Sequence, residues 1–332
     1  MDLVTAPPRS PVSGVLRLVS GETALRRWAI ASLVANILIV VTGGVVRLTA
    51  SGLGCPTWPR CTDDAYIAHP ELGLHGAIEF GNRLLTFVLI VIAVLTWVTA
   101  MRTSLRPRRG SRRVATAMAL GIPAQGIIGG ITVLTQLNPF VVALHFLLSM
   151  VLITLSVWLV RAAFRWDRRP VRPLTAGVVT FTFLAMWVAV WLGTMTTGSG
   201  PHAGDLDARR TGWDIVLIAH VHAYAVYAAI AGTVVALWLA RSRAVWLLLG
   251  VEVIQAAIGL SQYHLGLPIG LVGLHLLGAA LSIAAVANLR FSVRAVSPAA
   301  RPLQPLDTAA AGSVDRQTRR PSDQASGRQG DR

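Results

Sequence analysis

The chain has no lysine, only two cysteines and few charges of either sign. All 30 of its basic residues are arginine, and charged residues make up 14% of the 332 positions. Two cysteines are too few for a disulfide scaffold or a zinc finger. The low charge content, with 54% hydrophobic residues and a mean hydropathy of +0.60, excludes a disordered chain and argues against an ordinary soluble domain.

Long apolar runs dominate the sequence instead. A helix needs about 20 apolar residues to cross the hydrocarbon core of a bilayer, and eight stretches meet this length. The sequence therefore predicts an all-α polytopic membrane protein with eight transmembrane helices. The first span lacks a small-residue cleavage site, so we interpret it as an anchor rather than a removed signal peptide. The predicted spans are 28–46, 73–100, 114–134, 141–160, 174–195, 214–239, 244–262 and 269–289.

The arginines are distributed unevenly between the two sides that these spans define. Of the 30, 25 lie in the tails and loops on the side of the N-terminus, and one, Arg83, lies within a span. The positive-inside rule therefore predicts a multi-pass protein of the cell membrane with both termini cytoplasmic. Arginines between apolar runs are typical of membrane proteins, so we expect contact with lipid and no nucleic-acid partner. The four on the other side are Arg47, Arg60, Arg209 and Arg210.

The two halves of the chain carry the same motif. Gln125-Gly-Ile-Ile-Gly129 precedes His145, and Gln255-Ala-Ala-Ile-Gly259 precedes His275, with 20 residues from Gln to His in both cases. The first helix of each half also ends alike, with Thr49-Ala-Ser-Gly52 and Thr197-Gly-Ser-Gly200. Because each half has four spans, the sequence predicts two four-helix bundles that are parallel repeats about an axis along the membrane normal.

The repeat sets the expected division of the chain. We expect two four-helix halves, each holding one site, joined by a cytoplasmic linker and flanked by cytoplasmic tails. Residues 297–332 are rich in Pro, Ser, Gln, Asp and Arg, a composition that predicts disorder. The expected parts are an N-terminal tail over 1–27, a first half over 28–160, a linker over 161–173, a second half over 174–290 and a disordered basic tail over 291–332.

Histidines lie near the outer ends of three spans, where ionisable residues are costly and usually functional. Neutral imidazole is a good axial ligand for haem iron, and bundle cores are common cofactor sites. His222 and His275 therefore predict a bis-histidine haem b site in the second half. The alternative is that these histidines form hydrogen bonds between helices. His220 is a rival to His222; it is two residues away and points to another side of the helix.

The first half differs at one position. His145 matches His275, but Asn82, a poor iron ligand, stands where the second half has His222. His75, Glu79 and Asn82 are spaced i, i+4 and i+7 and so share one helix face. An iron bound by His145 with a carboxylate nearby suits chemistry, because one coordination position can stay open. The alternative for Glu79 is a structural ion pair with Arg83.

Two other groups in the sequence are candidates for structural or redox roles. Cys55 and Cys61 lie six residues apart in the first outer loop and can close a small disulfide. Such a disulfide would either shape the loop or act as a redox-active pair beside the first-half site. Glu252, in the seventh span, has no histidine near it in depth, so a structural role is expected there.

These residues together resemble bacterial haem A synthase. The resemblance rests on Gly43-Gly-Val-Val-Arg47-Leu-Thr-Ala-Ser-Gly52, the Cys55/Cys61 loop, Glu79-Phe-Gly-Asn82-Arg83, and the three histidines, and it covers about residues 25–290. It implies a haem b on His222 and His275, and haem O as substrate in the first half, with Glu79 and His145 at that site. It also implies the reaction, which oxidises the C8 methyl of haem O to a formyl group and yields haem A for terminal cytochrome oxidase.

The chain departs from the family pattern at Asn82, where the family usually has histidine. Either His75 replaces the missing ligand, or the substrate iron is five-coordinate. Haem O synthase and a quinone or another electron acceptor are candidate partners. The competing functions are a diheme b-type electron-transfer protein, which would be expected to have a His pair in both halves, and a haem transporter or chaperone.

Overall fold

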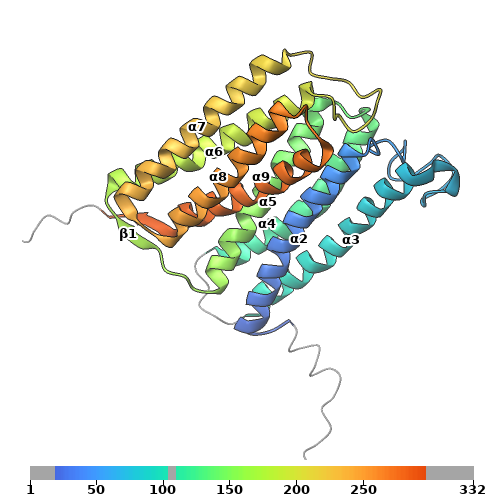
Figure 1. The fold of residues 1–332 in the computed structure, drawn as a ribbon. Helices are drawn as coiled ribbons and strands as arrows, with labels where there is room; N and C mark the ends of the chain where they lie inside the picture. The colour runs from blue at the N-terminus through green and yellow to red at the C-terminus, as the bar shows by residue number, and fades with distance from the viewer. Residues whose placement is uncertain (1–18, 104–109, 297–332) are drawn as a thin grey trace, which may run out of the picture. The chain divides into compact units, whose positions relative to one another are not determined.

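The computed structural model describes residues 19–103 and 110–296, and about three quarters of these are helical (Figure 1). All eight long helices are long and apolar enough to cross a membrane, which confirms the predicted fold class. The predicted disordered tail, 297–332, lies outside the described residues. The helices are α2 (Glu22–Leu48), α3 (Gly73–Arg102), α4 (Ser111–Leu134), α5 (Pro139–Ala163), α6 (Pro173–Ser199), α7 (Ile215–Ala240), α8 (Arg243–His264) and α9 (Ile269–Ser292).

The helices extend past the apolar runs by up to about two turns, because a helix can continue into the polar interface. The largest difference is at α2, which begins six residues before the predicted span, at Glu22. Polar residues stabilise several helix starts. The side chains of Asn138, Asp214 and Ser242 accept hydrogen bonds from the backbone N–H groups of the first turns of α5, α7 and α8.

The helices form two groups of four neighbours. In the first, α2 packs against α3 and α5, and α4 lies against both of these; in the second, α6 packs against α7 and α9, and α8 lies against both. The groups meet through contacts of α5 with α9, α2 with α9, and α5 with α6. The long loops after α2 and α6 lie at one end of the helices, and β1 lies at the other (Figure 1).

The repeat extends into the backbone of the turns. Between α4 and α5, Gln136 and Leu137 have φ values of 51° and 56°, and between α8 and α9, Gly266 and Leu267 have 73° and 62°. Leu137 N–H donates to the Thr132 carbonyl at 2.8 Å, and Leu267 N–H donates to the Gln262 carbonyl at the same distance. The same left-handed turn therefore joins the last two helices of each half.

A short sheet was not predicted from the sequence. Strand β1 (Arg169–Val171) pairs in parallel with β2 (Val293–Ala295). Strands of only three residues are too short for periodicity to reveal them. The sheet joins the segment before α6 to the segment after α9.

Candidate functional site

Two imidazoles from different helices of the second half face each other. His222 of α7 and His275 of α9 have ring centroids 6.4 Å apart, and the ring planes are inclined by 80°. Two imidazoles that share one metal have centroids about 6 Å apart, because each metal–nitrogen bond is about 2 Å long. The spacing therefore leaves room for a single iron between the two rings.

Neighbouring groups orient both rings. The Nδ1 atom of His222 donates to the Ala189 carbonyl of α6 at 2.8 Å, which leaves its Nε2 lone pair available to a metal. His222 lies against Gly193, and His275 lies against Gly259, where an added Cβ would come within 3.2 and 3.0 Å of the rings. These glycines allow each ring to lie close to the adjacent helix.

His220 has a different environment. Its side chain is exposed, its Nδ1 atom bonds to the Val216 carbonyl at 2.7 Å, and its ring contacts the edge of Tyr263. Of the two candidates that the sequence left open, the structure brings His222 to His275.

The first half repeats the environment of His275 but not that of His222. Gln125 Nε2 donates to the His145 carbonyl at 2.9 Å, and Gln255 Nε2 donates to the His275 carbonyl at 2.8 Å. Among the described residues, the buried Nδ1 atoms of His145 and His275 have no hydrogen-bond partner. His145 also lies against a glycine, Gly129. The two histidines therefore occupy equivalent positions.

The other polar residues of α3 contact neighbouring segments. Asn82 Oδ1 accepts a hydrogen bond from Thr42 Oγ1 of α2 at 2.8 Å, and His75 Nδ1 bonds to Ser51 Oγ at 2.9 Å. Within residues 19–103 and 110–296, no ring contact joins His145 to another imidazole. The structure thus has a facing pair of histidines in the second half, whereas the first half has a single histidine at the equivalent position.

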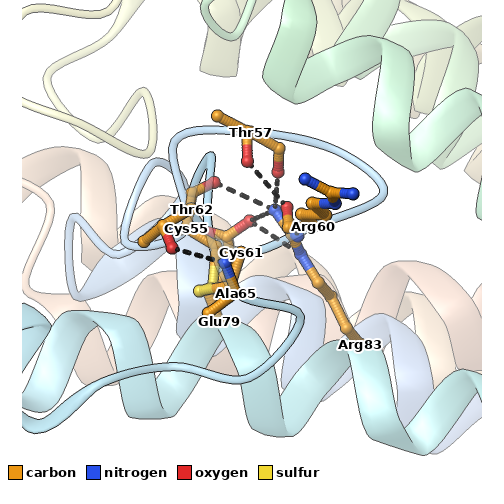
Figure 2. Close-up of a disulfide and its surroundings, with 8 residues drawn as sticks. All are labelled: Cys55, Thr57, Arg60, Cys61, Thr62, Ala65, Glu79 and Arg83. Atoms are coloured by element: carbon orange, nitrogen blue, oxygen red, sulfur yellow. Dashed lines mark hydrogen bonds and ion pairs between the residues drawn. A yellow bond between two sulfur atoms is a disulfide. The ribbon is translucent and has the colours of Figure 1, made fainter.

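Glu79 lies beneath the loop that contains the two cysteines (Figure 2). Cys55 and Cys61 form a disulfide, and both are fully buried, which supports the interpretation that the disulfide shapes the loop. Cys55 N–H donates to Glu79 Oε2 at 2.6 Å, and Arg83 Nη2 donates to Glu79 Oε1 at 2.6 Å. The ion pair with Arg83 that the sequence offered as an alternative is therefore present.

Arg83 connects Glu79 to the rest of this loop. Its guanidinium also donates to the carbonyl oxygens of Cys55, Thr57 and Arg60, as Figure 2 shows. The loop rests on α4 as well, because a Cβ added at Gly130 would overlap the Trp58 indole. The spacing in the sequence indicated the face of α3 but gave no sign of these contacts with the loop.

Glu252 lies apart from these groups. It is buried, and its Oε1 accepts a hydrogen bond from Thr233 Oγ1 of α7 at 2.9 Å. This contact joins α7 to α8 and is consistent with the structural role expected from the sequence.

The donor set fits haem better than a bare metal ion. Haem iron brings four ring nitrogens and needs only one or two axial ligands from the protein. In the described part of the chain, no three His, Cys, Asp or Glu side chains gather as a non-haem metal site would require. Two facing imidazoles, each with a glycine beside it, match the requirements of a bis-histidine haem.

Comparison with known proteins agrees with this geometry. A 31% identical stretch of 139 residues, 40% of this chain, matches 43% of the Heme A synthase of Lysinibacillus sphaericus. The Heme A synthase of Bacillus pumilus is 25% identical over 182 residues, 51% of this chain and 58% of that protein. That of Listeria welshimeri is 27% identical over 150 residues, 44% of this chain and 47% of that protein.

The matched stretches span about half the length of these curated relatives. A family model covers much more of the chain. The model described as cytochrome oxidase assembly protein, COX15-CtaA, matches residues 26–287, from α2 to the last turns of α9. The chain therefore belongs to the COX15-CtaA family of cytochrome oxidase assembly proteins.

Proposed function

We propose that this protein is a haem A synthase, a membrane oxidoreductase that oxidises the C8 methyl group of haem O to a formyl group. The family match and the names of the relatives support this function. The observation that carries the proposal is the difference between the two repeats. The second half has two facing imidazoles, whereas the first half has one imidazole and a carboxylate bonded to a disulfide loop.

The second half would hold a resident haem b through His222 and His275. When bound, this haem supplies reversible one-electron chemistry. The hydrogen bond from His222 to the Ala189 carbonyl fixes the tautomer of the ring, and Gln255 holds the backbone of His275.

The first half would receive the substrate, haem O, with His145 as its protein ligand. Asn82 is already bonded to Thr42, and His75 is bonded to Ser51 near the start of α3. Neither contact favours a second ligand on the substrate iron. We therefore assign His145 as the sole axial ligand from the protein, which leaves one position of the substrate iron open.

We assign Glu79 a role in acting on the substrate through its charge. A carboxylate held by a guanidinium and a backbone N–H has a fixed position, and it can stabilise positive charge that develops on the methyl carbon during oxidation. The distribution of arginines supports a site near the outer face of the membrane, with both termini cytoplasmic.

The test is co-expression with a source of haem O, followed by chromatography of the extracted haems. We expect haem A from the unaltered protein. Glu79→Gln should lower haem A output about 100-fold, because it removes the negative charge at the first site together with the ion pair to Arg83. It should leave the haem b spectrum unchanged, because the haem b ligands lie in the second half. His275→Ala should abolish the low-spin haem b spectrum.

Three outcomes would contradict the proposal. Haem b without haem O or haem A would indicate an electron-transfer cytochrome, and protein without haem would favour a transporter. Normal haem A output from Glu79→Gln would refute the role assigned to this carboxylate.

A further inference from the structure

Three basic side chains gather where the two halves meet at their outer end. Arg47 is in the last turn of α2, and His202 and Arg210 are in the segment between α6 and α7. Arg47 Nε donates to the His202 carbonyl at 2.6 Å, and its Nη2 donates to the Thr197 carbonyl at 3.0 Å. This guanidinium therefore joins the first half to a loop of the second.

No carboxylate neutralises this basic cluster in the described part of the chain. The ion pairs of Arg26 and Arg165 with Glu22, and of Arg83 with Glu79, do not involve the cluster. Arg210 donates only to backbone carbonyls, those of Ala208 and Pro201, both at 2.9 Å. Carbonyl oxygens accept hydrogen bonds but bring no net negative charge.

Two acidic residues of the same loop form hydrogen bonds with backbone N–H groups. Asp205 accepts a hydrogen bond from Asp207 N–H at 3.0 Å, and Asp214 caps α7 through Leu217 N–H at 2.7 Å. Burial lowers the pKa of His202, and the guanidinia of Arg47 and Arg210 lower it further. The two guanidinia therefore make the local field positive.

Donor groups in the basic cluster are available to a ligand. Within residues 19–103 and 110–296, Arg47 Nη1 and Arg210 Nε have no hydrogen-bond partner. Uncompensated guanidinia with free N–H groups are suited to a carboxylate, which they bind through short charge-assisted hydrogen bonds.

The end of α2 connects the basic cluster to the helix that carries His275. A Cβ added at Gly273 would lie 3.5 Å from Leu48, the neighbour of Arg47, and a Cβ added at Gly44 would lie 2.7 Å from Leu276. The last turns of α2 therefore pack against the turn of α9 that carries His275. His275 itself is six residues, about 9 Å, from the outer end of α9.

We propose that Arg47, His202 and Arg210 bind the propionate carboxylates of the haem held by His222 and His275. Haem carries two propionates on one edge, and their negative charge complements a site with no acid of its own. The inference rests on the proposed haem b of the second half. It makes Arg47, which belongs to the first half, a binding residue of the other half's site.

The test compares haem b with its dimethyl ester, in which both propionate charges are removed. Full-length protein freed of haem is titrated with each compound in neutral detergent, and binding is followed by absorbance. The unaltered protein should bind haem b at least tenfold more tightly than the ester. Arg47→Leu and Arg210→Leu should each weaken haem b binding by about tenfold or more and leave ester binding unchanged.

Arg209→Leu is the matched control, because it removes the same charge from the adjacent, exposed position of the same loop. It should change neither affinity. Equal weakening of haem b and ester binding by Arg47→Leu and Arg210→Leu would show that these residues only support the fold, and unchanged haem b binding would show that they do not contact the haem. Either result overturns the inference.

Further outcomes distinguish failure of the propionate site from failure of the proposed function and from binding of a lipid phosphate. If the unaltered protein bound no haem, the proposed function itself would fail; if it bound haem b and the ester equally, only the propionate site would fail. Phosphatidylglycerol vesicles test whether the basic cluster binds a lipid phosphate instead. If they weakened haem b binding to the unaltered protein and not to Arg47→Leu, the basic cluster would be a lipid site and the inference would be wrong.

Discussion

A single position separates the two repeats at the residue scale. The histidines of α5 and α9 share a glycine neighbour and a glutamine bonded to their carbonyl. The partner position differs, because α7 presents His222 whereas α3 presents Asn82. The amide oxygen of Asn82 accepts a hydrogen bond from Thr42. Among the described residues, no contact joins Asn82 to His145. Two sites of unlike coordination thus arise from one scaffold.

Asn82→His should therefore convert the first site toward the second. With haem O bound, we expect a change from a five-coordinate, high-spin iron to a six-coordinate, low-spin iron, because imidazole is a much better iron ligand than an amide. Electron paramagnetic resonance measures the spin state. Asn82→Ala is the control and should stay high-spin. A high-spin signal from Asn82→His would show that α3 does not direct this position toward the substrate iron.

The histidines and Glu79 could be found from the sequence because their signals are local. Intramembrane ionisable residues are rare, and the same spacing from Gln to His occurs once in each half. The partners of these residues could not be found in this way. Thr42 and Asn82 are 40 residues apart, and Arg47 and His202 are 155 residues apart. Neither pair leaves a periodic pattern, so only the packing of the helices reveals them.

At the scale of the element, the disulfide loop depends on two glycines, one in the helix beneath it and one within the loop. Trp58 lies over Gly130 of α4, and Gly54 lies directly against the backbone of His75. Any side chain at these positions would displace the loop and, with it, the N–H group that holds Glu79. The glycines therefore position the carboxylate indirectly.

Gly130→Val should loosen the loop. Overpacking costs about 1–3 kcal/mol, so the open form of the loop should become about tenfold more populated. The buried disulfide would then react faster with a water-soluble phosphine, measured by alkylation of the released thiols. Gly126→Ala, one turn earlier in α4, is the control, because its Cβ would meet only Thr86 at 3.7 Å. Equal rates in the two variants would contradict this role of Gly130.

At the scale of the whole molecule, two different signals determine the fold. Length and hydropathy predict eight spans, and the structure has eight helices at those places. The repeated motif predicted equivalent positions for His145 and His275, and the turns between helices repeat as well. The β1–β2 pair escaped prediction because each strand has only three residues and the two strands are more than 120 positions apart.

The positive-inside rule makes a prediction for the intact molecule. Asp207→Cys, in the exposed loop between α6 and α7, should react with a membrane-impermeant maleimide in whole cells. Arg241→Cys, exposed between α7 and α8, should react only after the membrane is permeabilised. The native cysteines are paired and give no background. Labelling of Arg241→Cys in intact cells would reverse the assigned orientation.

The small sheet has a consequence for how such a protein can be assembled. Its strands begin and close the second bundle, so the ends of that bundle are adjacent and joined by backbone hydrogen bonds. A unit whose ends meet can be separated from its neighbour without distorting either one. The protein should therefore tolerate a break between α5 and β1 and form from two co-expressed polypeptides. Duplication and fusion of a gene for a self-associating four-helix ancestor would leave this architecture.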